Sequence, residues 1–379
     1  MTTSRTIPYE PALDGLRGVS IVAVMAFHAS ATSGLGGWLR GGNLGVSVFF
    51  TLSGFLITSI LVSEVDGTGS IDLGRFWSRR IRRLVPAALV TVTAVILLGT
   101  ATDVITVRSS GATAAVWSFT NWHVIAAGDD RLLETIVGPL GPTWSLAIEE
   151  QFYVVLAVVA WIAARSARPV RMLTTVFLAV VPISILLANT VSDWHPRLEF
   201  GTDVRAAEIA IGGLVALGWR RWGGRLANSA ATADAAGFVG LAALLVLFQF
   251  ADSTPPWLLR GGYSVVAVAT ALVIVGLLAH GRLAAMLGTR PLVAVGRISY
   301  SLYLVHWPLM LVCTPARVGA NGLVLIGIKV AVSAAAALVL HHTVEQPIRQ
   351  LTALRTQTTV GMWLGASLAV TALAAMFAT

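Results

Sequence analysis

Long apolar stretches follow one another along almost the whole chain, with only short polar connections between them. Each stretch has roughly 16 to 22 residues, about the length that an α-helix needs to cross a ~30 Å hydrocarbon core. The pattern predicts an all-α polytopic membrane protein with about eleven transmembrane helices, namely a ten-helix core over 10–350 and one more helix within 351–379. The predicted spans are 16–34, 44–63, 84–102, 143–164, 170–190, 204–219, 235–251, 262–280, 292–313, 321–342 and 358–377.

Composition supports the membrane class and narrows the possible partners. Of 379 residues, 56% are hydrophobic and 12% are charged, whereas soluble proteins average about 45–50% apolar and about 25% charged residues. On a soluble domain the net charge of +8 would suggest nucleic acid, but here the arginines lie in short runs between apolar stretches. That distribution indicates membrane topology instead. Cys313 is the only cysteine, so an intramolecular disulfide is excluded and no metal site is predicted.

The distribution of basic residues predicts the orientation of the chain. If the N-terminus is cytoplasmic, most arginines fall in cytoplasmic connections, as the positive-inside rule requires. An odd number of spans then places the C-terminus outside a plasma membrane, and the longest hydrophilic connection, 103–142, lies on the outer face. No basic segment with a small-residue cleavage site precedes the first stretch, so we expect it to be a retained span.

An acid, a base and a histidine occur together in the first stretch, LDGLRGVSIVAVMAFH. On a helix, Asp14, Arg17 and His28 project within roughly 60° of one another, and a rise of about 16 Å separates Arg17 from His28. Asp14 and Arg17 lie one turn apart and can pair near the cytoplasmic end. An inside anchor and an interior hydrogen-bonded histidine would also account for Arg17 and His28. Ionisable groups within a membrane nevertheless favour a functional site.

Small polar residues and then arginines follow the first span. GVSVFFTLSGFLIT, which includes Ser53, indicates either close helix packing or a narrow polar wall beside the first span. Five arginines next occur at the predicted inner face, where they serve either topology and lipid contact or the docking of an anionic cytosolic ligand. Guanidinium groups suit phosphate. These residues are Arg75, Arg79, Arg80, Arg82 and Arg83.

Two neighbouring carboxylates lie within a span in the segment GPTWSLAIEEQFY. Pro142 and Thr143 are helix start signals, which places Glu149 and Glu150 about two turns into the membrane. Two adjacent carboxylates do not both face lipid. We therefore favour a functional role for the pair over a structural bond to an arginine such as Arg205.

A late span carries GRISYSLYLVHWP, in which Tyr303 and His306 are neighbours on one helical face. His306 fits either a packing and hydrogen-bonding role or a role in a site. Lys329 in the next span is expected either to snorkel or to pair. VEQPIR predicts that this span ends at Pro347, with Glu345 in a structural role.

These segments together resemble the bacterial membrane acyltransferase-3 family over roughly 10–350. The resemblance rests on the family's Arg-x10-His signature, met by Arg17 and His28, and on the order and spacing of further motifs. Those motifs are FFTLSGFLIT, RFWSRRIRRLVPA, SFTNWHVI, PTWSLAIEEQFY, GTDVRAAEIAIGG, RISYSLYLVHWP and VEQPIR.

The resemblance implies transfer of an acyl group, commonly acetyl, from cytosolic acyl-coenzyme A to a hydroxyl group. The acceptor would be a carbohydrate, a cell-envelope glycoconjugate or a secreted natural product. Acyl-coenzyme A would be a co-substrate, with no bound cofactor, no metal, no nucleic acid and no evident protein partner. Many relatives end in an extracytoplasmic esterase-like domain, which this sequence is expected to lack.

We expect His28 to be the general base toward the acceptor hydroxyl, because imidazole accepts and returns protons near working pH. An acyl-His28 intermediate is the covalent variant. Asp14 would hold Arg17 at the donor, and Glu149 or Glu150 would orient the acceptor or an active-site group. The residues assigned to substrate binding are the five arginines, Ser53, Trp144, Tyr303 and His306.

Two other classes of protein fit parts of the sequence. A proton-coupled transporter could use His28, Glu149 and His306 as a relay, although paired short helices broken by Gly or Pro are absent from the two halves of the sequence. An envelope scaffold without chemistry leaves the polar stripe of the first span unexplained. Release of free coenzyme A from an added donor would count against both classes. No motif specifies the acceptor or the acyl chain.

Overall fold

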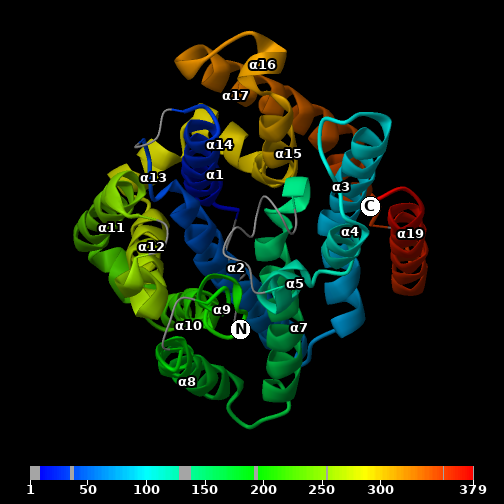
Figure 1. Ribbon diagram of the computed structural model, residues 1–379. Coiled ribbons are helices and arrows are strands. Elements are labelled where there is room, and N and C mark those ends of the chain that lie inside the picture. Colours follow the sequence, from blue (N-terminus) through cyan, green and yellow to red (C-terminus); the bar gives the residue numbers. More distant parts are fainter. Residues whose placement is uncertain are drawn as a thin grey trace. The chain divides into compact units, whose positions relative to one another are not determined.

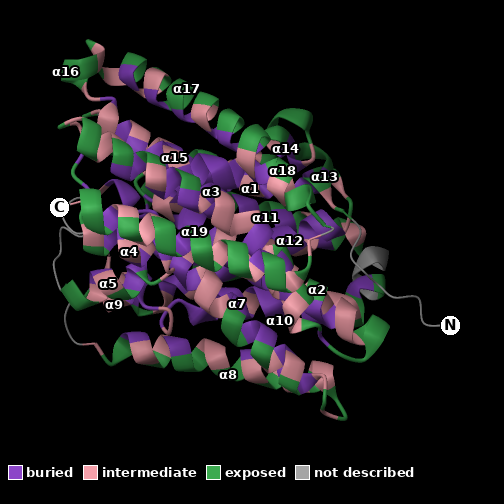
Figure 2. Cartoon of the chain, turned by 90° about the vertical axis from the view of Figure 1, so that its right-hand side faces the viewer, coloured by how far each residue is buried: buried purple, intermediate pink, exposed green. Residues whose placement is uncertain are grey.

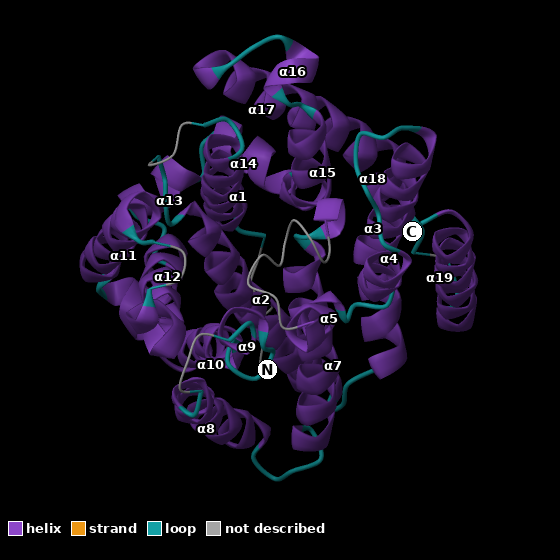
Figure 3. Ribbon diagram, viewed as in Figure 1, coloured by secondary structure: helices purple, strands orange, loops and turns teal. Residues whose placement is uncertain are grey.

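A computed structural model of the chain describes residues 9–34, 38–127, 138–191, 195–252, 255–352 and 354–378. This described part consists of helices and connecting loops and contains no strand (Figure 3). Nine of its helices are long and apolar enough to cross a membrane. The structure therefore confirms the all-α polytopic membrane class.

The chain divides into two compact units. Unit 1 comprises Met1–Phe27, Trp38–Ile71 and Gln151–Arg297, and unit 2 comprises His28–Gly37, Asp72–Glu150 and Ile298–Thr379. Two of the boundaries between the units fall inside helices, and both helices are labelled in Figure 1. They are α1 (Pro11–Ala31) and α7 (Thr143–Ala163).

Unit 1 packs its helices around an apolar core that includes the fully buried Phe55, Leu258 and Val273. Its remaining elements are η1 (Gly42–Leu44), α2 (Gly45–Thr68), α8 (Pro169–Asn189), α9 (Arg197–Phe200), α10 (Ala206–Asn228), α11 (Ala230–Phe250), η3 (Leu258–Gly262), α12 (Tyr263–Leu278), α13 (Arg282–Leu287) and α14 (Arg290–Arg297).

Helices α2 and α10 of unit 1 meet at glycines. A Cβ at Gly54 would lie 2.0 Å from the carbonyl oxygen of Ile209, and a Cβ at Gly212 would lie 1.9 Å from the carbonyl oxygen of Thr51. Neither helix can carry a larger residue there without moving its partner. Gly54, one of the small residues of the second predicted span, thus allows close helix packing.

Unit 2 buries a second apolar cluster around Tyr300 and Leu304. Helix α19 packs along α3, and exposed positions recur along α17 and α19 (Figure 2), as expected for helices with one face toward lipid. The elements of this unit are α3 (Leu73–Ala101), α4 (Ser109–Val116), α5 (Thr120–Ala127), η2 (Gly138–Leu140), α15 (Ser299–Val312), α16 (Pro315–Val318), α17 (Gly322–Leu340), η4 (His341–Glu345), α18 (Gln346–Gln350) and α19 (Thr356–Phe377).

Two of the predicted spans differ in the structure. The region 292–313 forms two helices, α14 and α15, that meet at Ile298, instead of one continuous helix. Helix α10 begins at Ala206, two residues into the predicted span 204–219, yet it is not among the nine apolar helices of the described residues. The reason is its charge, since Glu208, Arg220 and Arg221 lie within it.

The arginine run is helical and belongs to α3. Asp72 caps this helix, because its side chain accepts a hydrogen bond from the backbone N–H of Arg75 at 2.9 Å. The helix consequently begins at Leu73, well before the predicted start of the third span at residue 84. The arginines are thus held on successive turns of one rigid element.

The prediction that a late span ends at Pro347 is wrong. Helix α17 continues through the π-helical turn η4 into α18, which has Pro347 in its first turn. Pro347 directly follows the π-helical turn, where the register of the backbone hydrogen bonds changes, so the helical path accommodates a residue that has no N–H. The helical path therefore continues to Gln350.

Candidate functional site

Two histidines of unit 2 meet in a direct hydrogen bond. Nδ1 of His28, on α1, lies 3.0 Å from Nε2 of His306, on α15. The two rings are stacked with centroids 5.2 Å apart. His306 is completely buried, whereas His28 is partly exposed. The structure thus brings together two of the predicted site residues and leaves the first of them accessible.

The hydrogen bonds of His306 determine which nitrogen of each ring carries a proton. Nδ1 of His306 lies 2.8 Å from the carbonyl oxygen of Tyr303 and 3.1 Å from that of Leu302. A carbonyl oxygen only accepts, so Nδ1 of His306 is the N–H donor and Nε2 is the acceptor. His28 Nδ1–H must then donate to His306, which leaves the lone pair of the neutral His28 ring on Nε2.

Tyr303 and Trp307 join α15 to η2 and to the start of α7. The Tyr303 hydroxyl donates to the carbonyl oxygen of Pro142 at 3.0 Å and lies 2.7 Å from Ser145 Oγ. The Trp307 indole N–H donates to the carbonyl oxygen of Gly138 at 3.0 Å, and its ring is 4.8 Å from that of His28. The hydroxyl of Tyr303, predicted to bind substrate, is thus engaged in joining two helices.

Trp307 and Ser145 are neighbours of the site that were not predicted from the sequence. The i, i+4 spacing of Tyr303 and Trp307 was the available signal, since it places both rings on the face of His306. Trp144, predicted to bind substrate, is buried beside Ser145 at the start of α7.

Glu150 and Ser53, two further predicted site residues, each accept a hydrogen bond from a hydroxyl group. Glu150 Oε2 accepts a hydrogen bond from Ser118 Oγ at 2.5 Å, and both Glu149 and Glu150 are partly exposed. Arg205, the alternative partner considered for this pair, forms an ion pair with Glu208 within unit 1. Within unit 1, Ser53 Oγ accepts a hydrogen bond from the Tyr153 hydroxyl at 3.3 Å.

Asp14 and Arg17 pair on α1 as predicted. Arg17 Nη1 lies 3.6 Å from Asp14 Oδ1, and both side chains are mostly buried. The Tyr9 hydroxyl donates to Asp14 Oδ2 at 2.8 Å and accepts from Arg297 Nη2 at 3.0 Å. Asp14 thus holds Arg17 at the beginning of α1.

The five arginines of α3 differ in burial. Arg75 and Arg79 are exposed, and Arg75 pairs with Asp72 at 3.7 Å. Arg82 is buried, with Nη1 donating to Ser78 Oγ at 2.8 Å, while its Nε is buried and has no hydrogen-bond partner within the described residues. A buried donor without an acceptor is costly, so Arg82 has capacity for an anionic partner.

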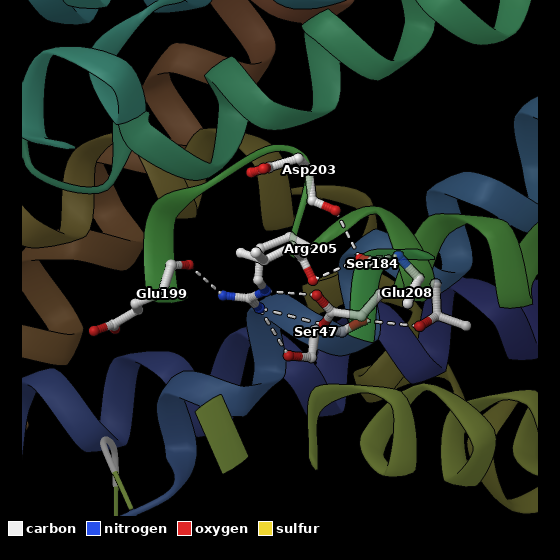
Figure 4. A network of polar contacts seen from close by, with 9 residues as sticks. Ser47, Ser184, Glu199, Asp203, Arg205 and Glu208 are labelled. Carbon is white, nitrogen blue, oxygen red and sulfur yellow. Dashed lines mark hydrogen bonds and ion pairs between the residues drawn. The ribbon is translucent and has the colours of Figure 1, made fainter. Parts of the chain in front are cut away.

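A different polar cluster lies inside unit 1 around Arg205 (Figure 4). Arg205 donates to Glu208 at 2.5 Å, to Ser47 Oγ at 3.1 Å and to the backbone oxygen of Glu199 at 2.8 Å. Its guanidinium carbon lies 3.7 Å from the centroid of the Tyr263 ring. Arg205 and Glu208 are almost completely buried. The sequence offered Arg205 only as a possible partner of the paired carboxylates and did not predict this cluster.

The Glu199 side chain next to this cluster changes charge near neutrality. Burial raises the pKa of Glu199 to about 7, although the positive charge of Arg205 acts in the opposite direction. Beside the ion pair of Arg205 and Glu208, the cluster therefore holds one acid that responds to pH. Among the described residues, no group of three or more His, Cys, Asp or Glu side chains gathers as metal ligands would.

Comparison with known proteins places this chain in a family. The model of a family described as the acyltransferase domain matches residues 10–377. The chain belongs to this acyltransferase family. The membership confirms the resemblance drawn from the motifs, and it covers both the histidine pair and the arginines of α3.

Several curated relatives of the chain bear the name O-acetyltransferase. The chain is 32% identical over 352 residues to O-acetyltransferase OatA of Staphylococcus aureus strain NCTC 8325 / PS 47, covering 90% of this chain and 57% of the relative. It is 32% identical over 321 residues to the putative O-acetyltransferase SAS0844 of S. aureus strain MSSA476, covering 81% and 51%. The chain thus spans little more than half the length of these relatives. No solved structure matches.

Proposed function

We propose that this chain is an integral-membrane O-acetyltransferase. It moves an acetyl group from cytosolic acyl-coenzyme A to a hydroxyl of a carbohydrate, cell-envelope glycoconjugate or secreted natural product. Family membership and the two O-acetyltransferase relatives support the reaction class. The observation that carries the proposal is the directional hydrogen bond from His28 to His306.

The histidine pair supports general-base catalysis at His28. With its Nδ1 proton donated to His306, neutral His28 accepts the proton of the acceptor hydroxyl at Nε2. The oxygen attacks the thioester carbonyl, the C–S bond breaks, and the proton on Nε2 passes to the departing coenzyme A sulfur. His306 holds the ring in this tautomer throughout, as the third group of a catalytic triad holds its histidine. We therefore assign His306 to positioning and not to substrate binding, which agrees with its complete burial.

A covalent route uses the same nitrogen. In that route Nε2 of His28 attacks the thioester carbonyl, coenzyme A departs, and the acceptor hydroxyl then takes the acetyl group from His28. Both routes require Nε2 to carry the lone pair. Trapping a hydroxylamine-sensitive acetyl group on the protein in the absence of acceptor would identify the covalent route.

The arginines of α3 are the proposed site for the phosphates of the donor. Their guanidinium groups match phosphate geometry, and the buried, incompletely bonded Arg82 is the strongest candidate among them. Within unit 1, Arg17, held by Asp14, is a candidate donor contact in its own right. The concentration of arginines also supports a cytoplasmic N-terminus and an extracytoplasmic C-terminus.

For the acceptor, the candidate contacts are Glu149 and Glu150. Both are partly exposed, and Glu150 already binds a hydroxyl, that of Ser118. A carboxylate that accepts a hydrogen bond from a hydroxyl can orient a sugar hydroxyl in the same manner.

Replacement of His28 tests the proposal. A deletion strain is complemented with the normal chain, with His28→Ala or with His342→Ala, which removes an exposed histidine of η4 as the matched control. Mass spectrometry then follows acetylation of envelope glycans and secreted metabolites, and membranes supplied with acetyl-coenzyme A are assayed for free coenzyme A. We expect His28→Ala to lower both by at least about 100-fold, because general-base catalysis contributes 10²–10⁴-fold.

The amount of folded protein must be equal in all three strains for the comparison. Undiminished acetylation by His28→Ala would remove His28 from the reaction. Coenzyme A release that is absent even from the normal chain, together with unchanged glycans and metabolites in the deletion strain, would overturn acetyl transfer itself.

A further inference from the structure

The only lysine of the sequence lies buried in unit 2. Lys329 is on α17 and is 1% exposed, and no carboxylate forms an ion pair with it within the described residues. Burying an ammonium group in a membrane protein is expensive, so such a group needs a specific set of acceptors. The two alternatives drawn from the sequence, snorkelling or pairing, are both replaced by a third arrangement.

Lys329 binds the end of α1. Its Nζ donates to the backbone oxygen of Thr32 at 2.8 Å and to Thr32 Oγ1 at 2.7 Å. Thr32 directly follows α1, where the last carbonyl groups of the helix lack intrahelical donors. A cation is favoured at that end by the helix dipole. Lys329 therefore caps α1 from a neighbouring helix.

Thr32, which Lys329 binds, is in turn hydrogen-bonded to His28, the proposed base. The Thr32 hydroxyl donates to the backbone oxygen of His28 at 2.7 Å, and the Thr32 N–H donates to the same oxygen at 3.1 Å. Because the hydroxyl proton of Thr32 is used toward His28, Oγ1 accepts from Lys329. A directional chain of hydrogen bonds thus runs from Lys329 through Thr32 to the backbone of His28.

His28 is consequently held at two points by two helices that pack against each other. His306 on α15 binds its ring, and Lys329 on α17 fixes its backbone through Thr32. Helices α15 and α17 are in direct contact. We propose that Lys329 is a positioning residue, which fixes the last turn of α1 so that Nδ1 of His28 stays aligned with Nε2 of His306. This inference rests on the proposed function of His28.

The expected effect of losing Lys329 is on the rate and not on binding. Lys329→Met removes the ammonium group but keeps most of the side-chain volume. We expect kcat to fall about 10- to 100-fold, because small misplacements of a catalytic group are costly, while KM for the donor and for the acceptor stay within about two-fold. Ser333→Ala is the matched control, since Ser333 is also buried on α17 and its hydroxyl has no hydrogen-bond partner among the described residues. This control should keep its kcat.

A pair of variants at Thr32 tests the same chain without removing the buried charge. Thr32→Ser keeps Oγ1 and should retain nearly normal kcat, whereas Thr32→Val keeps the shape and should lower kcat about 3- to 10-fold. Combining Lys329→Met with Thr32→Val should cost little more than Lys329→Met alone, because both break one chain. If Lys329→Met does not fold, the Ser and Val variants at Thr32 decide the proposal.

A spectroscopic measurement separates this proposal from the proposed function. In protein carrying ¹⁵N-labelled histidine, the His28 signals, assigned with His28→Gln, should report a protonated Nδ1 in the normal chain and a mixture of tautomers in Lys329→Met. Unchanged tautomers together with unchanged kcat in Lys329→Met would overturn the positioning role. An increased donor or acceptor KM with normal kcat would overturn it as well, since Lys329 would then bind substrate. An active His28→Ala variant would instead contradict the proposed function.

Discussion

Arg205 in unit 1 and Arg82 in unit 2 are both buried arginines in a membrane protein, and their surroundings differ in completeness. Arg205 donates to Glu208, Ser47 and the backbone of Glu199 and lies against an aromatic ring. Arg82 donates to Ser78, and its Nε has no acceptor within the described residues. The protein therefore provides several hydrogen-bond acceptors for the guanidinium group of Arg205, whereas one buried N–H of Arg82 lacks an acceptor among the described residues.

The difference separates a polar group that holds the fold from one that can take a ligand. A fully bonded buried ion pair has nothing left to offer to a substrate, and its loss leaves a charge without compensation. A donor without an acceptor is a cost that a bound anion can relieve. The histidine pair of unit 2 also has something to offer to a substrate. The direction of its hydrogen bonds leaves the lone pair of the neutral His28 ring on Nε2.

The largest effect is expected at Arg205. Arg205→Leu leaves Glu208 buried and unpaired, which costs about 3–5 kcal/mol, a large part of the roughly 5–15 kcal/mol that stabilises a typical protein. We expect little folded protein in detergent by size-exclusion chromatography and a much lower melting temperature. Arg205→Leu combined with Glu208→Leu should recover most of the stability. A double variant as unstable as the single one would contradict the structural assignment of this pair.

Part of the fold and of the candidate site could be predicted from the sequence. Helical periodicity places Asp14, Arg17 and His28 on one face, and the i, i+3 pairing of Asp14 with Arg17 follows from local geometry alone. Length and hydropathy similarly suffice for the membrane class. These features depend on residues that are near one another in the chain.

Contacts between residues that lie far apart in the chain could not be predicted from the sequence. The bond between His28 and His306 and the cap of α1 by Lys329 both depend on how α1, α15 and α17 pack in unit 2. The predicted end of the late span at Pro347 is wrong because this proline directly follows a π-helical turn, where a residue without an N–H is tolerated. The burial of Arg82 relative to Arg79 likewise depends on packing, since the two arginines look alike in the sequence.

The next largest effect is expected at His306, and it should be on rate. His306→Leu removes the acceptor for His28 Nδ1–H, so the tautomer with the lone pair on Nε2 is no longer enforced. We expect kcat to fall about 100-fold, within the range attributed to general-base catalysis, with unchanged KM for donor and acceptor.

His306→Gln is the matched variant for this test. Its side-chain oxygen can occupy the place of Nε2 and accept from His28, so it should retain more activity than His306→Leu. Steady-state kinetics on equal amounts of folded protein provide the measurement. Equal losses in both variants would show that packing at His306, and not its acceptor nitrogen, matters for the reaction.

The smallest effect is expected at Arg82, and it bears most directly on the contrast with Arg205. If the Nε of Arg82 binds a donor phosphate, Arg82→Gln should raise the KM for acetyl-coenzyme A about 10-fold with little change in kcat, because hydrogen bonds to charged groups contribute about 1.5–3 kcal/mol. Arg79→Gln, at an exposed position of the same helix, should change this KM about two-fold or less, since exposed charges are screened by solvent and salt. The stability of Arg82→Gln should stay close to normal, unlike that of Arg205→Leu. A loss of stability at Arg82 with an unchanged donor KM would mean that the incomplete bonding of this guanidinium has no relation to the donor, and the two arginines would then differ in degree only.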